Sequence, residues 1–165
     1  DTGALAADVV ITTSVLEWLE DPLPDLAARA LGLPPGTVGF SLERLRFLGG
    51  LPAVYSTNWM PLAVGRTLIG KPVLKGTQSL NATLREAGYR IYHARREVAA
   101  VLPPVDAARY LQLSKNVPAL QIKSMSRDIS GMPFDYYESY ARSDVVTISV
   151  DAQAVGDVEA GQKGL

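Results

Sequence analysis

The sequence contains no cysteine and one histidine among its 165 residues. The lack of cysteine excludes disulfides, thiolate metal sites and cysteine nucleophiles, and it makes a cytoplasmic protein the simplest expectation. His93 has no nucleophile-like motif beside it, so we predict no catalytic role for it. Walker loops, HExxH, G-x-S-x-G and dinucleotide fingerprints are also missing. We therefore expect no metal, no cofactor and no enzyme activity.

The charge of the chain is nearly balanced, with 16 basic and 17 acidic side chains and a formal net charge of −1. Such a chain has no excess of positive charge that would attract a polyanion, which disfavours direct binding of nucleic acid. No apolar stretch approaches the roughly 20 residues that span a membrane, so we expect no membrane contact. The chain opens at Asp1 without an initiator methionine, and we expect it to be a piece of a longer protein.

The composition is that of a folded domain, with 47% hydrophobic and 20% charged residues. A domain of this length buries roughly 70% of the surface of its unfolded chain, which is enough for a stable core without disulfides or metal ions. We predict one domain over residues 1–153. Residues 154–165 show neither the helical nor the strand periodicity of apolar residues, and we expect them to form a flexible tail.

A weak internal repeat organises the chain at a spacing of about 80 residues, where PDLAARALGL at 24–33 is similar to PVDAARYLQL at 104–113. Each half reads as strand, helix and hairpin, with a glycine turn followed by proline. We predict strands at 9–17 and 90–101, helices at 25–31, 79–87 and 105–111, and hairpins pairing 38–48 with 52–59 and 119–128 with 132–150. The expected fold class is α+β, a mainly antiparallel six-stranded sheet with helices packed on it.

Two arginines on one predicted strand are the main candidates for binding. Alternation in a strand places Phe40, Leu42, Arg44 and Arg46 on one face. Two like charges on a partly apolar face are unfavourable unless an anion compensates them, and guanidinium groups match phosphate and carboxylate oxygens in pairs. The residues alone leave open a solvated strand face, or salt bridges from these arginines to Asp135 or Glu138.

Two further segments carry polar candidates. Ser79 opens a predicted helix, where a hydroxyl either caps the helix or contacts an anion. In the last hairpin, Asp135, Tyr137, Ser139 and Ala141 point to one side and the intervening residues to the other. The residues do not decide which of these sides faces a pocket.

The order of these motifs resembles the UTRA domain, the effector-binding domain of HutC-like regulators within the GntR family. The resemblance covers about residues 8–150. It is carried by the helix ending ALGL, the strand ERLR with its GGLP turn, the helix opening QSL, the helix AARYL, and SGMP leading to SYARSD.

This resemblance implies a fold similar to chorismate lyase, used for binding, in a homodimer. Separate winged helix-turn-helix heads, upstream and absent from this chain, would bind operator DNA. The resemblance also implies that Arg44, Arg46 and Ser79 hold a phosphate or carboxylate of a small anionic metabolite. Further pocket positions would be Ser56, Asn81, Asp135 and Ala141.

Three of these positions depart from sensors of sugar phosphates. Ser56 stands in place of a glutamate, and Asn81 and Ala141 each stand in place of a tyrosine. We therefore expect a phosphonate, or another small phosphorylated or carboxylated metabolite. Two other functions stay open: a lyase that holds a carboxylate substrate with Arg44 and Arg46, and a dimerisation module without a ligand.

Overall fold

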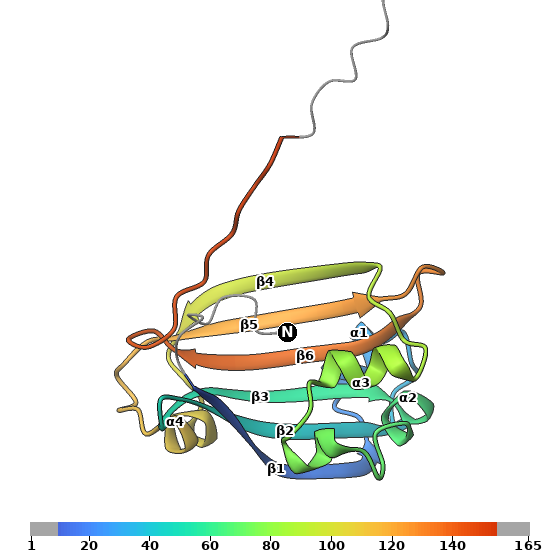
Figure 1. Cartoon of the computed structure of the whole chain (residues 1–165), viewed down its shortest axis with the longest axis horizontal. Helices are drawn as coiled ribbons and strands as arrows, with labels where there is room; N and C mark the ends of the chain where they lie inside the picture. The colour runs from blue at the N-terminus through green and yellow to red at the C-terminus, as the bar shows by residue number, and fades with distance from the viewer. Residues whose placement is uncertain (1–9, 155–165) are drawn as a thin grey trace, which may run out of the picture.

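The computed structural model describes residues 10–154, which form one six-stranded antiparallel sheet in the order β1-β2-β3-β6-β5-β4 (Figure 1). The strands are β1 (Ile11–Pro22), β2 (Val38–Leu48), β3 (Leu51–Pro61), β4 (His93–Val101), β5 (Ala119–Arg127) and β6 (Pro133–Arg142). The helices are α1 (Asp25–Ala30), α2 (Leu62–Arg66), the 3-10 helix η1 (Pro72–Lys75), α3 (Leu80–Glu86) and α4 (Val105–Leu111). The predicted α+β class with an antiparallel sheet is confirmed.

The chain repeats one unit, because β1-α1-β2-β3 is followed by β4-α4-β5-β6. The last strands of the two halves, β3 and β6, pair at the centre of the sheet, from Val54 opposite Ala141 to Trp59 opposite Tyr136. Helix α1 packs against Tyr136 of the second half. In return Tyr110 of α4 stacks on Tyr55 of the first half, with ring centroids 5.0 Å apart. Each helix therefore stabilises the central strand of the other half.

The two faces of the sheet carry different helices. Helices α1 and α4 cover one face, and Figure 1 shows α3 in front of the opposite face with α1 behind the sheet. On the α3 face, Phe40 and Leu42 of β2 form a buried cluster with Leu80 and Leu84 of α3. Helix α2 lies so close to β2 that a Cβ atom at Gly65 would overlap the side chain of Phe40. The α3 face is thus closed by apolar packing at the end of the sheet where α2 lies.

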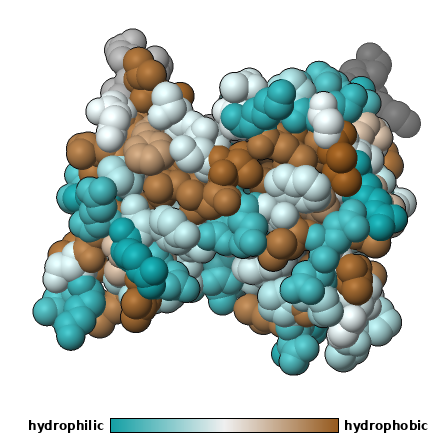
Figure 2. All heavy atoms as spheres, turned by 90° about the horizontal axis from the view of Figure 1, so that it is seen from below, coloured by the Kyte–Doolittle hydropathy of each residue, from teal (hydrophilic) through white to brown (hydrophobic). Residues whose placement is uncertain are grey.

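Both edge strands of the sheet are largely exposed. All positions of β4 from His93 to Ala100 are exposed. Strand β1 forms the lower edge in Figure 1, which faces the viewer in Figure 2, and apolar atoms gather across this edge. Ile11, Trp18 and Leu19 of β1 are each about two-fifths exposed, at 42%, 40% and 41%. An exposed apolar edge of this kind suits contact with another chain.

Three predicted strand ends are wrong. Strand β1 continues to Pro22, because it pairs with β2 along its length through a bulge between Val15 and Glu17. Strand β4 begins at His93 and not at residue 90. Strand β6 ends at Arg142 and not at residue 150, because the N–H groups of residues 145 and 146 turn back to the Arg142 carbonyl oxygen, at 3.2 and 2.9 Å. Figure 1 shows the following segment leaving the sheet.

The three predicted helices are confirmed within one residue at either end, and Gly88 follows α3 with a φ of 97°. The predictions missed α2 and η1, which are five and four residues long and have no side-chain cap. Elements of one turn are too short to show a helical period in a sequence. Of the predicted tail, 154–165, all but Ala154 lies outside the described residues. Within residues 10–154, no helix is long and apolar enough to cross a membrane.

Candidate functional site

The two candidate arginines are buried in the α3 face of the sheet. Alternation along β2 places Arg44 and Arg46 on the same face as Phe40 and Leu42, as predicted, and the two arginines are 3% and 8% exposed. The alternative of a solvated strand face is therefore wrong. Two guanidinium groups removed from water at alternate positions of one strand need compensation from their surroundings.

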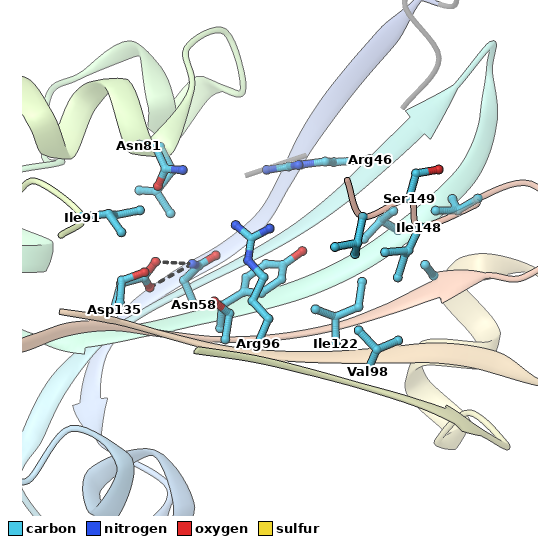
Figure 3. A pocket seen from close by; sticks show the side chains of 18 residues that line it. Arg46, Asn58, Asn81, Ile91, Arg96, Val98, Ile122, Asp135, Ile148 and Ser149 are labelled. Carbon is cyan, nitrogen blue, oxygen red and sulfur yellow. Dashed lines mark hydrogen bonds between the residues drawn. The ribbon is translucent and has the colours of Figure 1, made fainter. Parts of the chain in front are cut away.

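A buried chain of hydrogen bonds provides part of that compensation. Nη2 of Arg44 donates to Oδ1 of Asn58 at 2.9 Å. The amide nitrogen of Asn58 in turn donates to both carboxylate oxygens of Asp135, at 2.9 and 3.1 Å (Figure 3). Arg44 thus reaches Asp135 through Asn58, and not by the direct salt bridge that the sequence left open. We call this chain of three side chains the relay.

Burial shifts the pKa of both ionisable ends of the relay. Burial raises the pKa of Asp135, while the hydrogen bond from Asn58 and the charge of Arg44 act in the opposite direction. Burial, and after it the positive charge of Arg46, lower the pKa of Arg44 to about 10. A guanidinium with this pKa is still protonated at neutral pH. Among the buried groups of this face, two arginine charges therefore stand against one carboxyl.

The residues that pair with Arg44 across the sheet carry buried polar groups without a hydrogen-bond partner among the described residues. Arg44 pairs with Ser56 across β2 and β3, and Ser56 pairs with Ser139 across β3 and β6. Nε of Arg44 and the hydroxyls of Ser56 and Ser139 are buried and have no hydrogen-bond partner within residues 10–154. Ser56 is thus buried beside Arg44 on the neighbouring strand, and it lines neither of the two spaces described below, although the sequence predicted a pocket position.

A cavity of about 280 Å³ lies over this face, between the sheet, the start of α3 and the segment after β6 (Figure 3). Four of the predicted positions line it: Arg46, Asn81, Asp135 and Ala141. The structure therefore decides that the Asp135 side of β6 faces the pocket. The lining also includes Arg96 of β4.

An adjoining hollow of about 590 Å³ brings together the remaining candidates other than Ser56. It is lined by both Arg44 and Arg46, together with Lys75 and Ser79. Arg46, Leu80 and Asn81 line both spaces, so the two adjoin at these residues. The hydroxyl of Ser79 accepts a hydrogen bond from the backbone N–H of Ala82 at 3.3 Å. Ser79 is thus a helix cap that also borders the arginine hollow.

The sequence predictions missed several polar residues of the site, among them Asn58 and Arg96. Both lie on strands that were predicted, and alternation gives a signal for Arg96, which shares a face with Val98. His93 is exposed on the edge strand and lines neither space. Within residues 10–154, no group of three or more histidine, aspartate or glutamate side chains could hold a metal ion.

The family model for the UTRA domain matches residues 6–147. The chain belongs to the UTRA domain family. The resemblance predicted from the order of sequence motifs is therefore confirmed. No curated protein sequence matches this UTRA domain.

Solved structures show the same fold at low sequence identity. The effector domain of PhnF from Mycobacterium smegmatis superimposes with a TM-score of 0.80 and 20% identity, over 88% of this chain and 89% of that one. A GntR-family transcriptional regulator from Enterococcus faecalis gives a TM-score of 0.77 and 19% identity, over 86% of this chain and 100% of that one. Against the longer PhnF structure the match covers 64% of that chain. The fold is thus the chorismate-lyase-like fold of effector domains in GntR-family regulators.

Proposed function

We propose that this UTRA domain is the sensor of a HutC-like transcription regulator and binds a small anionic metabolite in the cavity beside Arg46. The observation that supports this proposal is the burial of Arg44 and Arg46 on one face, with Asp135 engaged by the relay. One carboxyl compensates one guanidinium, and a bound anion would compensate the second. Guanidinium forks suit phosphonate, phosphate and carboxylate oxygens.

The proposed ligand contacts extend from the arginines to the other lining residues. Arg46 and Asn81 border both spaces and would contact the ligand directly, and Ser79 would add a hydroxyl at the rim of the arginine hollow. Asp135 and Ala141 would shape the floor of the cavity. Ser56, the buried neighbour of Arg44 on β3, would act on the ligand only through the position of Arg44.

Regulation would follow from a difference in effector affinity between two orientations of DNA-binding heads. In this proposal residues 1–153 form the effector-binding domain of a cytoplasmic homodimer, and a separate winged helix-turn-helix domain binds the operator. The exposed apolar edge of β1 supports association with a second chain. The domain binds its ligand without turnover, since His93 is exposed on the edge strand and Asp135 is held by Asn58.

Thermal unfolding tests this proposal. Inorganic phosphate, methylphosphonate and small carboxylates are titrated against the wild-type chain, and a ligand present at 100 times its Kd stabilises by about 2.7 kcal/mol. For a domain of this size we expect a rise in Tm of roughly 5–10 °C. The double variant Arg44→Ala, Arg46→Ala should lose the response, and the control Arg85→Ala, at an exposed position of α3, should keep it.

The outcome also separates the two other functions. Identical, flat responses of wild type and double variant would disprove the anion site and favour a dimerisation module. Release of product from chorismate by the wild-type chain would favour the lyase.

A further inference from the structure

The cavity has two chemically different ends. Asn58, Asp135 and Arg96 form a polar end, and Val98 of β4, Ile122 of β5 and Ile148 after β6 form an apolar end. Figure 3 shows the three apolar side chains grouped on one side of Arg96, and Asp135 and Asn58 on the other, where Ile91 is the one labelled apolar side chain. The boundary between the two ends therefore runs through the middle of the cavity.

The strand register produces this boundary. Arg96 pairs with Ser124, and the next position on the same face, Val98, pairs with Ile122. Successive positions on one face of a strand lie about 7 Å apart. A polar row and an apolar row therefore lie side by side across β4 and β5, and a ligand only a few bonds long reaches both.

The apolar end is open to solvent. Val98 is 51% exposed, although its side chain lines the cavity. Ala141 contributes only a methyl group to the lining, which leaves room between β6 and the segment after it. A ligand that covers exposed apolar surface in a cavity gains binding free energy, roughly 25 cal/mol for each Å² removed from water.

We propose that the effector is an amphiphilic anion, whose charged group lies by Arg46 and Arg96 and whose short hydrocarbon group lies on Val98, Ile122 and Ile148. This inference rests on the proposed function and specifies its ligand. A sugar phosphate is disfavoured, because hydroxyl groups against these three side chains would lose hydrogen bonds to water without replacement. A cavity of about 280 Å³ lies at the lower end of ligand sites, so only the first few carbons of the hydrocarbon group would gain contact with it.

A chain-length series tests the inference. Methyl-, ethyl-, propyl-, butyl- and hexylphosphonate, and the carboxylates of matching length, are titrated into the wild-type chain by calorimetry. We expect the affinity to rise about fourfold with each methylene group until the apolar end is filled. The better of the two series identifies the charged group. Glucose 6-phosphate should bind more weakly than butylphosphonate.

Two variants localise the hydrocarbon group. Val98→Ser and Ile148→Ser should each reduce the gain per methylene to less than twofold, while methylphosphonate binds them as it binds wild type. Val98 is on the exposed edge strand and Ile148 lies outside the strands, so neither change removes a core side chain. The matched control is Val105→Ser on α4, where the side chain is 78% exposed and lines neither space.

The possible failures are distinguishable. If methylphosphonate binds through Arg44 and Arg46 but affinity is independent of chain length, the amphiphilic ligand is wrong and the anion sensor stands. If no phosphonate, phosphate or carboxylate binds, both are wrong. If Val98→Ser leaves the dependence on chain length unchanged but dissociates the protein in sedimentation, the apolar end is an interface between copies, and the inference is overturned.

Discussion

Asp135 accepts two hydrogen bonds, of 2.9 and 3.1 Å, from the side-chain amide of Asn58. Because the amide oxygen of Asn58 accepts from Arg44 at the same time, this one side chain links a buried cation to a buried anion that do not touch. The charges at the two ends fix the orientation of the amide. Buried polar networks of this kind are rigid when complete and costly when broken.

Replacing the central member of the relay should therefore be costly. Asn58→Leu leaves the Arg44 guanidinium and the Asp135 carboxyl buried without their shared partner, and we expect a loss of about 3 kcal/mol in the free energy of unfolding. Urea denaturation measures it. Asn81→Leu, which alters an amide at the half-buried rim of the cavity, is the control and should cost less than about 1 kcal/mol. Equal losses in the two variants would contradict a structural role for the relay.

Part of the site could be predicted from the sequence, because it depends on local periodicity. Alternation alone places Arg44 and Arg46 on one face of their strand, and Asp135 on one face with Ala141, but it does not decide that the arginine face is buried. The role of Asn58 could not be predicted, since its partner Asp135 is 77 positions away and the pairing depends on the register of β3 on β6. Contacts between distant strands are set by the packing of the whole sheet, and no local pattern encodes them.

The same distinction applies to the fold. The hairpins and three helices were predictable from glycine turns and helical spacing. The end of β6 was not, because the apolar run VVTISV continues the strand pattern beyond Arg142. The structure ends the strand with a turn in which Arg142 also pairs with Asp144 at 2.8 Å. The residues after this turn line the cavity, so the error in the predicted strand also concealed Ile148.

The unused hydroxyl of Ser139 leads to a second prediction. Its Oγ is buried and has no hydrogen-bond partner within the described residues, so its removal loses no bond and relieves the cost of desolvation. We expect Ser139→Ala to raise the free energy of unfolding by about 1 kcal/mol in the absence of ligand. Ser143→Ala is the control, because that hydroxyl donates to the Pro118 carbonyl oxygen at 2.8 Å and its loss should not stabilise. A destabilised Ser139→Ala would mean that the hydroxyl is hydrogen-bonded in solution.

The close approach of α2 to β2 gives a third prediction. Gly65→Ala places a methyl group inside the space of Phe40, and we expect overpacking to cost about 1–3 kcal/mol in urea denaturation. Ala63→Ser changes an exposed position of the same helix and should cost less than about 0.5 kcal/mol. If Gly65→Ala were as stable as wild type, the packing of α2 on Phe40 would be looser than the structure shows.

The raised pKa of Asp135 gives a pH dependence with a definite sign. Burial makes the folded protein bind the Asp135 proton more tightly than the unfolded chain, whose carboxyl titrates near 3.9. The stability from this proton is fully present below that value and is lost as the pH rises through the higher folded pKa. We expect the unfolding free energy of wild type, relative to Asp135→Asn, to fall as the pH rises above about 4.

Asp144 provides a control of opposite sign. The hydrogen bond from Arg142 lowers the pKa of Asp144, so its contribution is present above the unfolded value and is lost as the pH falls through the folded value. Wild type relative to Asp144→Asn should therefore gain stability as the pH rises from about 2 to about 4. Urea denaturation of both variants across this range and up to pH 8 measures the two slopes. A difference for Asp135→Asn that increased with pH would show that Arg44, acting through Asn58, outweighs burial at this carboxyl.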